Sequence, residues 1–103
     1  MNELVQAVCD DPVSVLHDSS RAADQLVAAG GASVPLIAEA LRSDLSSQAH
    51  PIDIVEALGQ ILARIAVKDR AAVAALLSDE SIKGDKSLVE WALESAEAKR
   101  SPK

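Results

Sequence analysis

The chain has 103 residues, of which 49% are hydrophobic, and its formal net charge is −6. This acidic balance argues against nucleic-acid binding as a primary role, because contacts to phosphates need a basic surface. The sequence holds one Trp and no Phe or Tyr, whereas the helix formers Ala and Leu are abundant, so helices are favoured over strands. We therefore expect a single all-α domain over residues 1–103.

The sequence also bears on the compartment. The N-terminal stretch MNELVQAV lacks the basic region that opens a signal peptide. No apolar run approaches the roughly 18 residues that span a bilayer. Cys9 is the only cysteine, so no intrachain disulfide can form, which fits a reducing environment. These features predict a cytoplasmic protein that does not bind membranes.

The N-terminal segment predicts two short helices. The first covers residues 2–9 and ends at Asp10 and Asp11, because Pro12 lacks an N–H group and restrains the residue before it away from helical geometry. The second helix begins near Pro12, with apolar residues at Val13 and in the following turn.

The stretch from Arg21 to Leu41, RAADQLVAAGGASVPLIAEAL, predicts two more short helices and looks like the stretch around which the chain is organised. Ser19 or Ser20 can cap the first of them. Gly30–Gly31 ends it, because glycine reaches positive φ without steric cost. Ser33 is expected to cap the second helix. A connection this short predicts that the two helices are antiparallel neighbours.

This stretch resembles a HEAT repeat. In that family Ala-Ala and Leu mark the first helix, Val-Pro-x-(Leu/Ile) opens the second, and Ala-Leu closes it. The resemblance implies a short α-solenoid of stacked αα-hairpins, in which the second helices present a concave surface to a partner. The N-terminal helices would then be an incomplete terminal repeat. The matching residues are Ala22, Ala23, Leu26, Gly30, Val34, Pro35, Ile37, Ala40 and Leu41.

The second half predicts a long helix over about residues 52–67, opened by Pro51, then a short helix capped by Asp69 and a last helix over about 86–99. The first two repeat the earlier hairpin with an offset of 36 residues, below the usual period of about 40–47. No proline or glycine marks their turn. In total we expect five to six helices. The polar residues expected on the solvated face of the long helix are Glu56, Gln60 and Arg64.

The apolar faces predict the core, and little predicts chemistry. His17 and His50 are the only histidines, and Cys9 lies eight residues from His17 across a proline, which is not a metal-ligand spacing. A single Cys in an apolar helix is typical of a core position. We expect no catalytic residue, metal or cofactor, and hence no enzyme. The side chains predicted to be deeply buried are Leu26, Ile37, Leu41, Leu58, Ile61 and Leu62.

Size and charge leave two classes of function open. The first is a non-catalytic protein-binding module, most concretely a small acidic immunity or inhibitor protein of bacteria that binds and neutralises a basic toxin or effector. The second is a helical adaptor or regulatory subunit of a larger complex. An enzyme of the HEAT-like DNA glycosylase kind is disfavoured by the length and the acidic charge.

The predicted partner surface lies in the first half of the chain. Residues 1–50 carry seven acids against two bases, whereas residues 51–103 carry nine against eight. Such an excess would steer a basic partner, or it would serve only solubility. Trp91, the one large aromatic, is either an interface anchor or a plug at the edge of the core. The residues predicted to contact a partner are Asp10, Asp11, Asp18, Asp24, Glu39, Arg42, Asp44 and Trp91.

Overall fold

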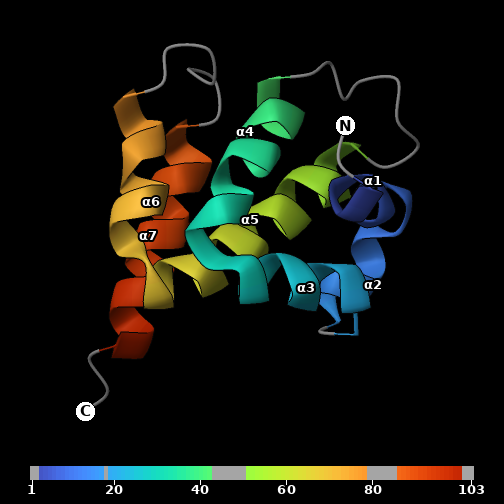
Figure 1. The fold of residues 1–103 in the computed structure, drawn as a ribbon, viewed down its shortest axis with the longest axis horizontal. Helices are drawn as coiled ribbons and strands as arrows, with labels where there is room; N and C mark the ends of the chain where they lie inside the picture. The colour runs from blue at the N-terminus through green and yellow to red at the C-terminus, as the bar shows by residue number, and fades with distance from the viewer. Residues whose placement is uncertain (1–2, 18, 43–50, 79–85, 101–103) are drawn as a thin grey trace.

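The computed structural model describes residues 3–17, 19–42, 51–78 and 86–100. These residues contain no strand, which confirms the all-α class (Figure 1). None of the helices in these ranges is long and apolar enough to cross a membrane. In chain order the elements are α1 (Glu3–Asp10), α2 (Pro12–Leu16), α3 (Arg21–Ala29), the 3-10 turn η1 (Gly30–Ser33), α4 (Val34–Arg42), α5 (Pro51–Lys68), α6 (Arg70–Ala74), the 3-10 turn η3 (Ala75–Ser78) and α7 (Lys86–Arg100).

The structure is organised around α5. This helix packs most extensively against α7, and it also contacts α1, α2, α3, α4, α6 and η1. In Figure 1 it crosses the middle of the view behind α4, with α6 and α7 on one side and α1 and α2 on the other. A helix becomes central in this way when its apolar residues reach most of its circumference. The stretch from Arg21 to Leu41 is therefore one of several segments around α5, and not the organising element that the sequence suggested.

The apolar surface of α5 explains its position. Buried residues occur at adjacent positions along α5, so they point to several sides of the helix. The helix therefore contacts neighbouring elements on several sides. The six side chains predicted to be deeply buried are all buried, three of them on α5. The buried residues of α5 are Ile54, Ala57, Leu58, Gly59, Ile61, Leu62, Ala63, Ile65 and Ala66.

The N-terminal corner follows its sequence signals. Pro12 is the first residue of α2, and the carboxylate of Asp11 accepts a hydrogen bond from the backbone N–H of Ser14 at 3.3 Å. Asp10 closes α1 and accepts a hydrogen bond from the side-chain amide of Gln6 at 3.0 Å. Both carboxylates therefore have local partners, one as a helix cap and the other along its own helix.

Both ends of α3 follow the prediction, but the start of α4 differs from it, and α3 and α4 are not among the element pairs in substantial contact. Ser20 is the cap of α3, because its hydroxyl accepts from the N–H of Ala23 at 3.1 Å. Gly30 ends α3 with a φ of 63°. Ser33 differs from the prediction: its buried hydroxyl donates to the carbonyl of Leu26 at 2.7 Å, which ties η1 back to α3. In Figure 1, α3 runs along the lower part of the view and α4 rises from η1.

Candidate protein-binding surfaces

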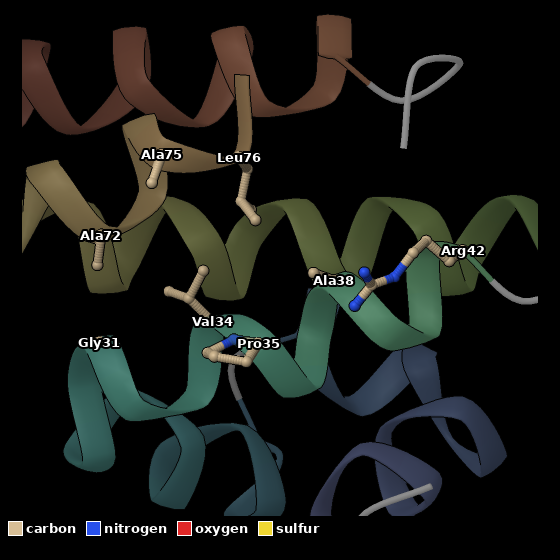
Figure 2. Close-up of a pocket in the computed structure, with 8 residues that line it drawn as sticks. All are labelled: Gly31, Val34, Pro35, Ala38, Arg42, Ala72, Ala75 and Leu76. Carbon is tan, nitrogen blue, oxygen red and sulfur yellow. The ribbon is translucent and has the colours of Figure 1, made fainter. Parts of the chain in front are cut away.

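A groove separates η1 and α4 from α6 and η3 (Figure 2). Its volume is about 380 Å³, and its lining is almost entirely apolar. In Figure 2, α5 runs behind the groove, between the two lining segments. We call this hollow the α4–α6 groove. The residues that line it are Gly31, Val34, Pro35, Ala38, Arg42, Ala72, Ala75 and Leu76.

Small residues create this space. Ala38, Ala72 and Ala75 each present a single methyl group where a larger side chain would fill the groove. Gly31 sets the close approach at one end, because a Cβ atom added there would collide with the carboxylate of Asp69 and would lie 3.2 Å from the Cβ of Ala72. The second glycine of the pair thus serves contact between two segments, whereas the first supplies the positive φ.

The two ends of the groove carry opposite charges. Asp69, which abuts Gly31, caps α6 by accepting from the N–H of Ala72 at 3.2 Å, as predicted. Arg42 lies at the other end, in the last turn of α4, where a cation suits the negative end of the helix dipole. In Figure 2 its side chain extends along α4 in the direction of Ala38. The groove is therefore an apolar slot lined at one end by the guanidinium-bearing Arg42, with the Asp69 carboxylate beside Gly31 near the other end.

A second hollow, of about 330 Å³, lies between α5 and α7. It is lined by Glu56 and Gln60 from α5 and by Leu88 and Trp91 from α7, and we call it the Trp91 hollow. Trp91 is 46% exposed, so it is neither a buried plug nor fully in solvent. Gln60 is half-buried, although the spacing by four placed it on a solvated face.

Gly59 brings the two walls of the Trp91 hollow together. A Cβ atom added at Gly59 would lie 2.5 Å from Cδ1 of Leu88 and 3.6 Å from Cζ3 of Trp91. The absence of a side chain therefore lets α7 approach α5, with one edge of the indole ring packed on the α5 backbone. This role is not visible in the sequence, because a glycine within a helical pattern usually only lowers helix propensity.

The predicted partner residues do not meet at a single hollow. Arg42 lines the α4–α6 groove, Trp91 lines the other hollow, and Glu39 is exposed on α4. Asp24 is exposed on α3. Its carboxylate forms an ion pair with Arg64 and accepts a hydrogen bond from Nη2 of that residue at 3.0 Å. Asp10 and Asp11 have the local partners given above. The remaining two predicted residues, Asp18 and Asp44, lie outside the described residues.

The residues considered for catalysis or metal binding are the cysteine and the two histidines. Cys9 is buried, and that burial, reinforced by the charge of Asp10, raises the pKa of its thiol. A raised pKa leaves little thiolate, which is the nucleophilic form. His17 is exposed, and His50 lies outside the described residues. Within the part of the chain that the structure describes, no group of three or more His, Cys, Asp or Glu side chains is placed to hold a metal ion.

Comparison with known proteins adds no family. No family model matches the chain, and no significant match is found among the curated proteins or the solved structures. The resemblance to HEAT repeats thus rests on the residues between Ala22 and Leu41 alone.

Proposed function

We propose that this chain is a non-catalytic protein-binding module that uses the α4–α6 groove as its anchor site. The observation that carries the proposal is the groove itself, an apolar hollow of about 380 Å³ with Arg42 in its lining and the carboxylate of Asp69 beside Gly31. It lies between α4 and α6, the second helices of the two segments that repeat with an offset of 36 residues. In a short HEAT-like array of hairpins, second helices build the binding surface.

The groove suits one part of a partner helix. From Pro35 to Arg42 the wall rises about 10 Å, which is two turns of α-helix. One or two aliphatic side chains spaced by three or four residues would fill such a length. Interfaces gain most of their free energy from a few anchors of this kind in desolvated pockets. The charges of Asp69 and Arg42 would set the direction of the partner helix.

The most concrete version of this function is an immunity or inhibitor protein that binds a basic toxin or effector. The support for it is the net charge of −6, which favours fast association with a basic protein. Glu39 and the N-terminal carboxylates Asp10 and Asp11 would contribute to that field as exposed groups. They act at a distance and need not touch the partner.

A helical adaptor or regulatory subunit is the second candidate. The observation that favours it is a second set of exposed apolar side chains away from the groove. Ile52 is 74% exposed on α5, and Trp91 is 46% exposed on α7. Exposed apolar surface at two separate places fits a subunit that meets more than one neighbour.

A pair of matched variants tests the groove. Ala75, the first residue of η3, lines it, whereas Ala71 is exposed one turn earlier on α6 and does not line it. Ala75→Arg should fill the groove with a long side chain, and Ala71→Arg adds the same charge and volume outside it. Both variants should keep the helical circular-dichroism spectrum of the wild type.

The measurement begins with affinity capture from the lysate of the source organism and continues with each captured protein in purified form. We expect wild type and Ala71→Arg to bind one basic protein with the same dissociation constant, and Ala75→Arg to weaken binding at least tenfold. A multi-subunit assembly in place of one basic partner would favour the adaptor. Equal binding by both variants would rule out the groove as the anchor site.

A further inference from the structure

We propose that the Trp91 hollow binds the guanidinium group of an arginine side chain on a protein partner. The indole of Trp91 would stack on the guanidinium plane, the carboxylate of Glu56 would accept its N–H groups, and the side-chain carbonyl of Gln60 would accept another. That the cation belongs to a protein rests on the proposed function, whereas the binding of the cation does not.

The position of Trp91 supplies the first argument. The indole is anchored at one edge, since Cζ3 would lie 3.6 Å from a Cβ atom at Gly59, yet 46% of the residue remains exposed. The ring is therefore held in place by α5 while much of its surface is available. A fixed aromatic ring of this kind binds a cation without the entropic cost of ordering a mobile side chain.

The lining supplies the second argument. A hollow with an aromatic wall, one carboxylate and one amide matches a flat cation with several N–H donors. Arginine fits this set better than lysine, because guanidinium stacks on aromatic rings and donates to a carboxylate in two parallel bonds. Leu88 adds an apolar wall for the methylene stem of the arginine. About 330 Å³ is ample room for one such side chain.

The surrounding charges supply the third argument. Within four residues of a lining residue, the described part of the chain has three further carboxylates and two basic side chains. One of those bases, Arg64, forms the ion pair with Asp24, so its charge is offset. Together with Glu56, the two helix segments that bear the lining residues carry four carboxylates against two bases, a balance that favours cations over anions. These neighbouring residues are Asp53, Glu90, Glu94, Arg64 and Lys86.

Trp91 is also the reporter of the experiment, because it is the only Trp and the chain has no Tyr or Phe. The probe is a blocked peptide, acetyl-Gly-Arg-Gly-amide, titrated into the wild-type protein at low ionic strength while Trp fluorescence is recorded. The control probe replaces arginine by citrulline, which has the same shape and no charge. We expect a saturable change in Trp91 emission with the arginine peptide, and binding at least tenfold weaker with the citrulline peptide.

Two charge-matched variants locate the site. Glu56→Gln removes the carboxylate from the hollow, and Glu3→Gln removes an exposed carboxylate from α1. Glu56→Gln should weaken binding of the arginine peptide about tenfold, the scale expected for one charge-assisted hydrogen bond. Glu3→Gln should change the dissociation constant less than twofold. The indole N–H resonance of Trp91, followed by NMR in the same titrations, should move only when the peptide binds.

Three results would overturn the proposal: an equal response to arginine and citrulline peptides, no saturable response to the arginine peptide, or equal weakening by the two Glu→Gln variants. Ala75→Arg separates this site from the groove. If the groove proposal fails, Ala75→Arg and wild type bind the partner with the same affinity. The peptide titration does not depend on that result, because it measures binding at the Trp91 hollow alone.

Discussion

The α3–η1–α4 region and the α5–α7 region are built by different kinds of information. In the first, each feature is set by a residue close in the sequence: Ser20 caps α3 and Gly30 ends it. In the second, the decisive contact joins residues far apart, since Gly59 of α5 admits Leu88 and Trp91 of α7. Local signals fix where helices begin and end, and distant contacts fix where hollows form.

The difference has a consequence for function. The α3–η1–α4 region contributes one wall of the α4–α6 groove, but Gly31 forms that groove only because Asp69 and Ala72 of another segment pack against it. The α5–α7 region contributes a complete hollow from two helices. A partner that bound both hollows would therefore contact six elements, η1, α4, α6 and η3 at the groove and α5 and α7 at the Trp91 hollow.

The largest expected effect tests the central place of α5. Leu58→Ala should lower the free energy of unfolding by roughly 2–5 kcal/mol, because Leu58 is fully buried and its removal leaves a cavity. Gln60→Ala should lower it by about 0.5 kcal/mol or less, as a partly exposed position. Urea unfolding followed by circular dichroism measures both. Similar losses at the two positions would mean that the buried face of α5 is assigned wrongly.

The second prediction contrasts the glycines of the two regions. Gly30→Ala should lower the free energy of unfolding by roughly 1–3 kcal/mol, the cost of a non-glycine residue in a strained backbone conformation. The strain acts alone, since φ is 63° and no atom lies within 4 Å of the added Cβ. Gly59→Ala should change stability by about 1 kcal/mol or less, because the gain in helix propensity offsets the contact with the flexible Leu88 side chain.

Trp91 fluorescence distinguishes these two glycine variants further. Gly59→Ala should shift the emission, since a Cβ at Gly59 displaces Leu88, which lines the same hollow as Trp91. Gly30→Ala should leave the emission unchanged, because Gly30 belongs to the other region. If Gly30→Ala alone shifted the emission, the two regions would be coupled more tightly than their contacts indicate.

The sequence was sufficient for the elements and the core, for identifiable reasons. Pro12, the capping residues Ser20 and Asp69, and the positive-φ Gly30 act within one turn, so these helix ends could be predicted from neighbouring residues. Periodicity gave the buried faces, and Leu58 and Leu26 are buried as expected. The central position of α5 was missed because packing between helices depends on how wide each apolar face is in three dimensions.

The candidate surfaces were only partly predictable. Trp91 was named from residue type alone, and the structure places it in a hollow with Glu56, which is exposed as the spacing by four predicted, and with Gln60, which is half-buried. The α4–α6 groove depends on the lack of a side chain at Gly31 and the small side chain of Ala75. Small residues give no periodic signal in a sequence. The predicted acidic surface, in turn, could not show that Asp24 would have Arg64 as a partner.

The smallest expected effect concerns this ion pair, which joins the two regions. Asp24 and Arg64 are both partly exposed, so their pair should contribute about 0.2–1 kcal/mol to stability and weaken in salt. Asp24→Asn and Arg64→Gln should therefore give similar, small losses in the free energy of unfolding. Stability alone does not reveal whether Asp24 also steers a partner.

Association kinetics do reveal it, because the two variants change the local charge in opposite directions. If Asp24 steers a basic partner, Asp24→Asn should slow association at low salt, and Arg64→Gln should speed it, since removing the cation makes the surface more negative. Glu39→Gln, at an exposed position of α4, gives the size of the effect expected for one exposed carboxylate. Stopped-flow association at two salt concentrations measures all three. Equal association rates for Asp24→Asn and Arg64→Gln would mean that the ion pair does not steer a partner and only links α3 to α5.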